Sequence, residues 1–221
     1  MKLHKKSFGC FLVAISAVWL TGCATREADS SEMTIRGFNT CTAAKPQQLL
    51  GKDGTVFTCG IRDGRFRFRF EVVDSDVCVA TKVKHPLDLA GGDRVEVYFV
   101  PDAKMEKGYC CAEIDASGRV LSYSVDEKKT FDWFWKFATL ESEAKRTADG
   151  YTVAGSVSVD ELKSFGIDPA SFYLGVFRAE MSAPDKTAKW CSAAPLVLPA
   201  HFHQPTMLFP FKSTDAVGSG F

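Results

Sequence analysis

Aromatic side chains are the most prominent chemistry-bearing groups of this sequence. Residues 131–137, Phe-Asp-Trp-Phe-Trp-Lys-Phe, place Trp133 and Trp135 on one parity and Phe134 on the other. Flat aromatic faces stack on ring-shaped ligands, and planar polar side chains beside them supply directional hydrogen bonds. On a strand both faces of this segment would be aromatic. Two interpretations stay open: the segment is buried on both sides, or Trp133 and Trp135 line a platform in a loop.

Two further residues combine an apolar setting with a polar or aromatic group. Arg178 follows the apolar stretch 173–177, where a guanidinium needs a carboxylate or a ligand as its partner. We expect a structural ion pair with Glu113 or Asp115, with ligand contact as the alternative. Trp190 either closes the core of the domain or stacks on a ligand.

Metal binding and catalysis find little support. His201 and His203 would share one face of an extended segment, but no third ligand converges on them by spacing, so no metal site is expected. The chain contains no Gly-x-Ser-x-Gly, no His-Glu-x-x-His and no phosphate-cradling glycine loop. Asp74 and Asp76 lie at a strand end, where turn formation explains them. We therefore expect a binding protein without a cofactor, and not an enzyme.

Charge and cysteine content limit the partners and the compartment. The chain carries 27 basic and 27 acidic residues and no basic stripe, so nucleic acid is not an expected partner. Six of the eight cysteines lie beyond residue 23, and an oxidising compartment would allow disulfides among them. At least one disulfide is expected, with buried free thiols as the alternative. Cys110 and Cys111 are adjacent and would point to opposite faces of a strand.

The N-terminus predicts export. A lysine-containing start is followed by an apolar run over residues 8–20 that is too short for a permanent anchor, as in a signal peptide. The run ends in Leu-Thr-Gly-Cys, which resembles the lipobox of bacterial lipoproteins. This resemblance implies cleavage after residue 22, acyl chains such as palmitate on Cys23, and a lipid anchor in the bacterial cell envelope. Ala24 favours the outer membrane, facing the surface or the periplasm. Residues 23–33 are small and polar, as in a flexible tether.

Residues 34–212 carry the pattern of a single domain made of short strands. Residues 65–73 alternate strictly, with Phe66, Phe68 and Phe70 on one face and arginines on the other, which indicates a strand with one face in the core. Residues 93–100 alternate in the same way. The arginine row is expected to be a solvated face paired with acids across the strand, with a surface for an anionic ligand as the alternative. Further strands are predicted over residues 56–61, 109–115, 119–125, 151–159 and 172–180.

Only one helix is predicted, over residues 160–165, with Ser158 or Asp160 as its N-cap and Gly166 at its end. Many strands and one short helix indicate an all-β antiparallel sandwich of the jelly-roll or immunoglobulin type. Residues 213–221 are expected to be a disordered tail.

The strand sequences resemble the family 9 carbohydrate-binding modules and their DOMON-like relatives. Residues 92–99, Gly-Asp-Arg-Val-Glu-Val-Tyr-Phe, look like the D-[ST]-V-E-[VI]-[FY] strand of that family. Tyr109, residues 113–115 and Gly118 are similar to its Y-x-x-E-I-[ND]-x-x-G hairpin. Residues 150–162 and 175–178, Trp190 and residues 202–211 follow its later motifs in order. The resemblance spans about residues 34–212 and implies a β-sandwich that binds glycans.

The family also shows where this chain departs from it. Members that bind sugar ends clamp the ring between two tryptophans, one in the loop before the D-x-V-E strand and one before the last strand. The corresponding loops here, residues 84–92 and 195–201, contain no tryptophan. Ala154 and Ser158 replace a frequent Glu and Pro. These changes leave the fold expectation intact and weaken the sugar expectation.

The expected function is therefore a membrane-anchored, non-catalytic, carbohydrate-binding lipoprotein, with a glycan or polysaccharide as partner and a supporting role in polysaccharide breakdown. The expected ligand-binding residues are Trp133, Trp135, Trp190, Arg178, Glu113 and His203. One alternative is a protein-interaction or assembly lipoprotein on the same fold. A second alternative is a haem-binding DOMON-type domain, for which a Met and a His must converge; the candidates are Met105, Met181 and Met207 with His85, His201 and His203.

Overall fold

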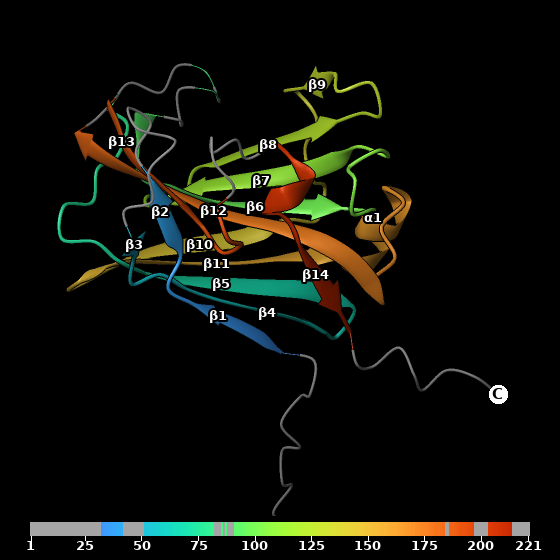
Figure 1. Ribbon diagram of the computed structural model, residues 1–221, viewed down its shortest axis with the longest axis horizontal. Helices are drawn as coiled ribbons and strands as arrows, with labels where there is room; N and C mark the ends of the chain where they lie inside the picture. The colour runs from blue at the N-terminus through green and yellow to red at the C-terminus, as the bar shows by residue number, and fades with distance from the viewer. Residues whose placement is uncertain are drawn as a thin grey trace, which may run out of the picture.

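The computed structural model describes residues 32–41, 51–81, 85, 87, 91–183, 186–196 and 203–213. Within them the chain forms two antiparallel sheets stacked as a sandwich (Figure 1). The five-stranded sheet has the order β1-β4-β5-β11-β10, and the nine-stranded sheet the order β3-β2-β13-β12-β6-β7-β8-β9, with β14 paired to β12. The all-β sandwich with one short helix, expected from the sequence, is confirmed.

The strands of the five-stranded sheet are β1 (Met33–Arg36), β4 (Val56–Arg62), β5 (Arg65–Val73), β10 (Glu141–Thr147) and β11 (Gly150–Ser158). Those of the nine-stranded sheet are β2 (Asn39–Cys41), β3 (Gly51–Lys52), β6 (Arg94–Val100), β7 (Tyr109–Asp115), β8 (Val120–Val125), β9 (Phe131–Asp132), β12 (Ser171–Ala183), β13 (Lys186–Ser192) and β14 (Phe209–Lys212). One 3-10 turn, η2 (Pro205–Met207), precedes β14.

Strand β5 is the centre of the five-stranded sheet and follows the predicted alternation. Phe66, Phe68 and Phe70 are buried, whereas Arg67 and Arg69 are exposed. The register pairs Phe68 with Gly155 of β11. A Cβ atom at position 155 would lie 2.3 Å from the Phe68 ring, so only glycine lets the ring cross the neighbouring strand.

The arginine row on the opposite face of β5 is solvated, as expected, but the acids that pair with Arg67 and Arg69 lie in the turn before β5 and on β5 itself, and not across the strand. Arg67 Nη2 lies 3.6 Å from Asp63, and Arg69 Nε lies 3.1 Å from Glu71. Arg65 donates to Ser156 Oγ over 2.9 Å. Exposed pairs of this kind contribute little stability, so the register of β5 is fixed mainly by its phenylalanine face.

The main core lies between the two sheets. Phe66 contacts Phe99, Phe172 and Phe211 of the nine-stranded sheet, with ring centroids 5.3, 5.6 and 5.3 Å apart. The inward alternation predicted for β6 is confirmed, because Val95, Val97 and Phe99 belong to this core. Edge-to-face contacts between phenylalanines add to the burial of apolar area.

The short helix α1 (Val159–Ser164) begins where the sequence predicted. Ser158 is the N-cap, and its hydroxyl accepts hydrogen bonds from the backbone N–H groups of Asp160 and Glu161. Leu162 is buried in the main core. Gly166 follows with φ +82°, a left-handed conformation that ends the helix.

The central strands of the nine-stranded sheet are buried on both faces, whereas an antiparallel sheet commonly has one face in water. Every residue of β6 and β7 is buried. The face turned away from the main core carries a second apolar set, which we call the outer-face cluster. Its buried members are Tyr98, Val100, Met105, Tyr109, Cys111, Leu121, Tyr123, Val125, Phe177, Leu196 and Met207, with Phe131, Trp133, Tyr173, Trp190 and Leu208 packed against them.

The cysteines confirm one sequence expectation and not another. Cys110 lies in the main core and Cys111 in the outer-face cluster, so the adjacent pair does point to opposite faces. The five cysteines whose side chains are described are Cys59, Cys78, Cys110, Cys111 and Cys191, and all are buried free thiols. No disulfide joins these five, so the expected bridge is not found. Burial raises the pKa of Cys110 and Cys111 well above the ordinary value, which makes them poor nucleophiles.

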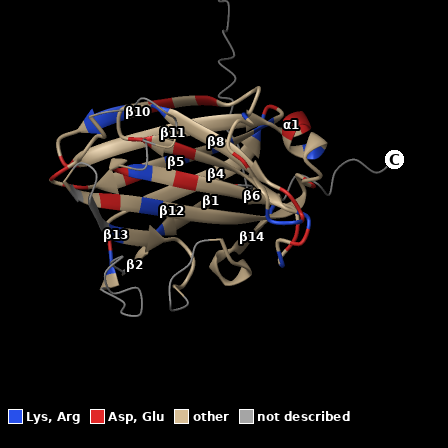
Figure 2. Cartoon of the chain, turned by 90° about the horizontal axis from the view of Figure 1, so that it is seen from above, with Lys and Arg blue, Asp and Glu red and all other residues tan. Residues whose placement is uncertain are grey.

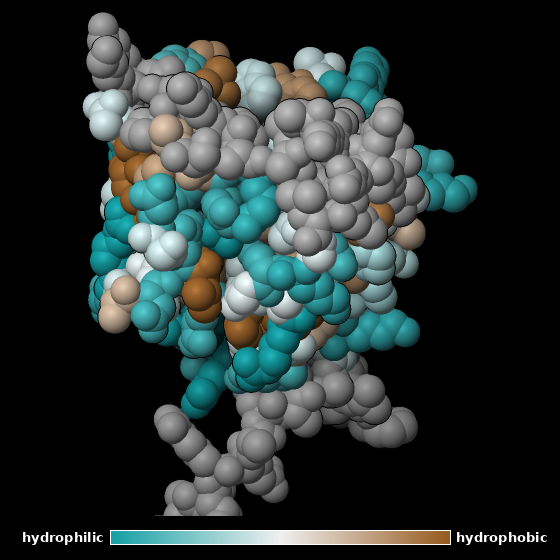
Figure 3. All heavy atoms as spheres, turned by 60° about the vertical axis from the view of Figure 1, so that its left-hand side comes forward, coloured by the Kyte–Doolittle hydropathy of each residue, from teal (hydrophilic) through white to brown (hydrophobic). Residues whose placement is uncertain are grey.

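Charged residues of both signs are interspersed over the strands and loops (Figure 2). The end of the sandwich that carries the segment after β5 shows mainly hydrophilic side chains with small hydrophobic areas between them (Figure 3). Among the described residues no helix is long and apolar enough to cross a membrane. The expected signal peptide, Cys23 and most of the tether lie outside the described residues, as does the tail after residue 213.

Candidate ligand-binding site

The register of the nine-stranded sheet brings charged and aromatic residues together on its outer face. Glu96 of β6 lies directly opposite Glu113 of β7. Like charges in directly opposite positions destabilise a strand pair unless a cation lies between them. Arg94 supplies that cation from the next outward position of β6. Ala179 lies between Arg94 and Trp190 in one row of residues across β6, β12 and β13, and its small side chain leaves room for both.

Arg94 holds the two carboxylates. Its Nε donates to Glu113 Oε2 over 2.8 Å, and its Nη2 lies 3.0 Å from Glu96 Oε1. The other oxygen of Glu96 accepts from the Tyr98 hydroxyl over 3.1 Å. The side chains of Arg94, Glu96 and Glu113 are at most 9% exposed. Burying two carboxylates with one guanidinium leaves an excess negative charge in a region of low polarity.

This excess changes the protonation of Glu113. Burial, and then the neighbouring Glu96 carboxylate, raise the pKa of Glu113 to about 8, although Arg94 opposes the shift. Burial acts to lower the pKa of Arg94, but the two carboxylates raise it above its ordinary value, so the guanidinium stays charged. At neutral pH Glu113 thus carries a proton for much of the time, and its carboxyl can donate as well as accept hydrogen bonds.

Aromatic rings surround this charged group. The Trp190 ring centroid lies 5.0 Å from Arg94 Cζ, a cation–π contact. Tyr98 stacks on Tyr109, with ring centroids 5.3 Å apart and planes at 15°. His203 stacks on Tyr98 at 5.5 Å, and its Nδ1 lies 2.6 Å from the Tyr109 hydroxyl. These contacts hold His203 in place although its side chain is exposed.

Residues 131–137 fit neither of the interpretations drawn from the sequence. The segment leaves β9 and turns, because Asp132 Oδ1 accepts the backbone N–H groups of Phe134 and Trp135 over 3.0 and 3.1 Å. Trp133 then faces the outer-face cluster and lies 4.7 Å from Tyr123 between ring centroids. Trp135 instead packs against the main core, 4.6 Å from Phe137. The turn separates two tryptophans that share one parity in the sequence.

Of the six expected ligand-binding residues, four lie on the outer face. Trp133 and Trp190 belong to the outer-face cluster, Glu113 is bonded to Arg94, and His203 stacks on Tyr98. Trp135 and Arg178 do not join them. Arg178 shares the inward parity of Leu174 and Val176 on β12 and is completely buried between the sheets.

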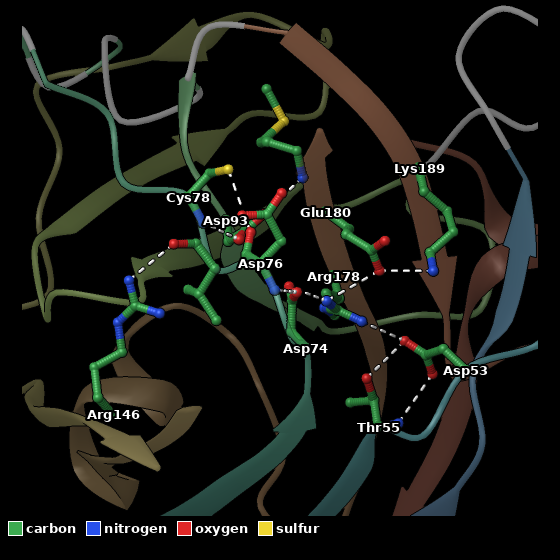
Figure 4. Close-up of polar contacts among 12 residues, drawn as sticks. Asp53, Thr55, Asp74, Asp76, Cys78, Asp93, Arg146, Arg178, Glu180 and Lys189 are labelled. Carbon is green, nitrogen blue, oxygen red and sulfur yellow. Dashed lines mark hydrogen bonds and ion pairs between the residues drawn. The ribbon is translucent and has the colours of Figure 1, made fainter. Parts of the chain in front are cut away.

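The expected ion pair of Arg178 with Glu113 or Asp115 is wrong. Arg178 Nη1 donates to Asp53 over 2.9 Å, and its Nη2 donates to Asp74 over 2.5 Å (Figure 4). Glu180 lies 3.0 Å from the same Nη2 and is also paired with Lys189 at 2.6 Å. Glu113 and Asp115 lie on the other face of the sheet, so they are out of reach of Arg178. This network joins the two sheets at one end of the sandwich.

A second buried acid lies beside this network. Asp93 accepts the backbone N–H groups of Cys78 and Met181, each over 2.6 Å. Burial raises the pKa of Asp93 to about 6; the two backbone hydrogen bonds oppose this shift, and nearby Asp74 adds to it. Asp93 thus fastens the start of β6 to the end of β12 and to the segment after β5 (Figure 4).

The described residues hold no group of three or more His, Cys, Asp or Glu side chains that would fit a metal ion. His201, one member of the histidine pair considered for metal binding, lies outside them. For the haem alternative, Met105 and Met207 are buried in the outer-face cluster and His203 lies against its tyrosines.

Comparisons with known proteins show the fold. No family model and no curated protein matches the chain. A crystal structure from Bacteroides uniformis ATCC 8492, described provisionally as a carbohydrate-binding protein, is similar with a TM-score of 0.60 at 12% identity. The match covers 81% of this chain and 85% of that chain. The two proteins share one fold.

Two structures of a family 9 carbohydrate-binding module from Caldicellulosiruptor kristjanssonii are also similar. One is in complex with glucose, with a TM-score of 0.46 at 14% identity over 72% of this chain and 75% of that chain. The other is in complex with cellotriose, with a TM-score of 0.49 at 13% identity over 82% of this chain and 86% of that chain.

Several residues of the outer face were not expected from the sequence to belong to the site, namely Arg94, Glu96, Tyr98, Tyr109, Tyr123 and Phe131. A signal for them was present. Tyr98 and Glu96 alternate with the core residues of β6, and Tyr109 and Glu113 alternate in the same way on β7. Two neighbouring strands with large side chains on both faces indicate that a sheet has a second covered face.

Proposed function

We propose that the protein binds a glycan on the outer face of its nine-stranded sheet. The observation that carries this proposal is the row in which Trp190 lies over Arg94, with Arg94 bonded to Glu96 and Glu113. Tryptophan faces stack on the C–H side of a sugar ring, and planar charged groups bind its hydroxyls. The outer face places both kinds of group side by side.

The residues divide into two roles. Trp190 and Trp133 are the tryptophans that pack against the outer-face cluster while remaining half-buried, so each keeps part of its surface accessible for stacking. His203 at the exposed margin supplies hydrogen bonds to hydroxyl groups, whereas Glu113 is buried and holds Arg94 beneath the Trp190 ring. Trp135 and Arg178 act in folding and not in binding, because they face the main core.

A binding role fits these groups better than catalysis does. Glu96 and Glu113 are the paired carboxylates of this face, but both are bonded to the same guanidinium. A glycosidase needs one carboxyl on each side of the scissile bond, each free to act on it. The fold neighbour from Bacteroides uniformis, described provisionally as a carbohydrate-binding protein, is in keeping with a binding role.

We also propose that Cys23 anchors the domain to a bacterial outer membrane through acyl chains. The lipobox-like residues 20–23 and the polar segment that follows support this proposal. The first strand, β1, belongs to the five-stranded sheet, at the opposite side of the molecule from β9 (Figure 1). A tether that enters at β1 would leave the outer face of the nine-stranded sheet free. Fatty-acid labelling of cells that make wild type or Cys23→Ser tests the anchor: label should be lost in the variant, and equal label in both would contradict it.

A glycan array probed with the purified mature protein tests the binding proposal. We expect selective binding to one class of neutral glycan, confirmed by titration at millimolar or lower concentration. Absence of binding to any glycan at millimolar concentration would contradict the proposal and favour the assembly-lipoprotein alternative. A visible absorption band in the same preparation would instead favour the haem alternative, since protein side chains do not absorb there.

A further inference from the structure

Among the described residues, Phe134 has the most exposed large hydrophobic side chain, at 82%. Its neighbours in the chain are both packed: Trp133 against the outer-face cluster and Trp135 against the main core. A phenylalanine left in water forgoes about 2 kcal/mol of burial, and ligand-binding sites are lined mainly by hydrophobic and aromatic side chains. Phe134 is therefore a candidate for contact with a ligand.

The loop that presents Phe134 is fixed by the structure on both sides. Asp132 holds the backbone N–H groups of residues 134 and 135. Trp133 is stacked on Phe131 at 4.8 Å with planes at 15°, and Trp135 is packed edge-on against Phe165 at 5.7 Å. A ligand that stacks on Phe134 would order little additional chain, so little of the contact energy is lost to entropy.

His85, from the segment before β6, lies beside Phe134. The ring of His85 lies 6.4 Å from that of Phe134, with planes at 87°. The Nδ1 atom of His85 accepts the backbone N–H of Leu87 over 3.2 Å, which orients the imidazole. An aromatic face with an edge-on imidazole beside it offers the same combination of apolar surface and hydrogen-bonding edge as the outer face.

Phe134 lies directly beside the proposed glycan site. Its Cα is one residue, about 3.8 Å, from that of Trp133, which lines the outer face. We propose that Phe134 and His85 form a second stacking position for a neighbouring sugar unit of the same glycan. The protein would then select an oligosaccharide or polysaccharide over a single sugar. This inference rests on the proposed glycan binding and adds the length of the ligand to it.

The test is a titration series with the array-selected glycan as its mono-, di-, tri- and tetrasaccharide. Wild type should bind the longer members about tenfold more tightly than the monosaccharide, which corresponds to about 1.4 kcal/mol. Phe134→Ala should bind the monosaccharide as wild type does and lose the gain with length. Phe134→Tyr should keep the gain, because it retains the ring.

Val73→Ala is the matched control. Val73 is 60% exposed on the five-stranded sheet, and this variant should bind every member of the series as wild type does. Equal length dependence in wild type and Phe134→Ala, or no length dependence in wild type, would overturn the inference while leaving glycan binding intact. If no member binds to any variant, the proposed function itself fails, and this inference fails with it.

Discussion

The guanidinium of Arg94 lies 5.0 Å from the centroid of the Trp190 ring, two strands away across β12. This relationship depends on Ala179, the small residue between them, and on two carboxylates that keep the guanidinium in place. It converts the outward face of an ordinary sandwich sheet into a surface with an aromatic ring above a buried charge. Trp190 and Arg94 together form the centre of the proposed binding site.

The stability of the domain should depend on pH through Glu113. Its pKa is about 8 in the fold against an ordinary 4.5, so the folded state binds a proton that the unfolded state releases between these values. The contribution of Glu113 to the free energy of unfolding is therefore fully present below about pH 4.5 and falls as pH rises toward 8, by at most about 1.4 kcal/mol per pH unit. Asp93 acts in the same direction between about 3.8 and 6.

Denaturant unfolding of wild type and Glu113→Gln at pH 6, 7 and 8 checks this prediction. Above pH 6 Asp93 is largely ionised in the folded protein, whereas Glu113 still titrates. The unfolding free energy of Glu113→Gln should therefore depend less on pH than that of wild type in this range. A wild-type profile that rises with pH between 6 and 8, or an unchanged slope in the variant, would contradict the assigned protonation of Glu113.

Arg178 should be a stabilising residue and not a binding residue. Replacing it by methionine would leave Asp53 and Asp74 buried without their cation, which costs about 3–5 kcal/mol of unfolding free energy. Lys163→Met removes the cation from the exposed pair with Asp160 and should cost less than about 1 kcal/mol. Chemical denaturation measures both. A loss at Arg178 no larger than at Lys163, or a glycan affinity that falls while the folded fraction is unchanged, would contradict this role.

The two faces of β5 should differ sharply in their sensitivity to mutation. Phe68→Ala removes a buried ring from the main core and should cost about 3–5 kcal/mol. Arg67→Ala, on the solvated face, should cost well under that, because its contact with Asp63 is exposed. Similar losses at the two positions would show that the register of this strand is wrong.

Much of the fold is predictable from the sequence where one face of a strand is apolar and the other polar. Strand β5 is such a case, and its inward face was predicted residue by residue. Strand β10 was not predicted, since its residues, Glu-Ser-Glu-Ala-Lys-Arg-Thr, are almost all polar. It lies at the edge of the five-stranded sheet and pairs only with β11, so it needs no apolar face of its own.

The site was predictable only in part, for two physical reasons. Parity assigns faces within a continuous strand, but the turn at Asp132 interrupts the strand and sends Trp133 and Trp135 to different layers. The partners of Arg178 are 125 and 104 residues away along the chain, and no local pattern identifies Asp53 or Asp74 among the other acids. Burial of Arg178 followed from its apolar strand; its partners required the tertiary structure.

Calorimetric titration of the array-selected glycan into three proteins, wild type, Trp190→Ala and Trp135→Ala, tests whether the glycan binds on the outer face of the nine-stranded sheet. Trp190 lies over Arg94 on the outer face, whereas Trp135 packs against the main core. We predict that Trp190→Ala weakens binding at least about tenfold, the equivalent of about 1.4 kcal/mol, and that folded Trp135→Ala binds as wild type does. Unchanged affinity in Trp190→Ala, or an equal loss in both variants, would contradict a glycan site on this face.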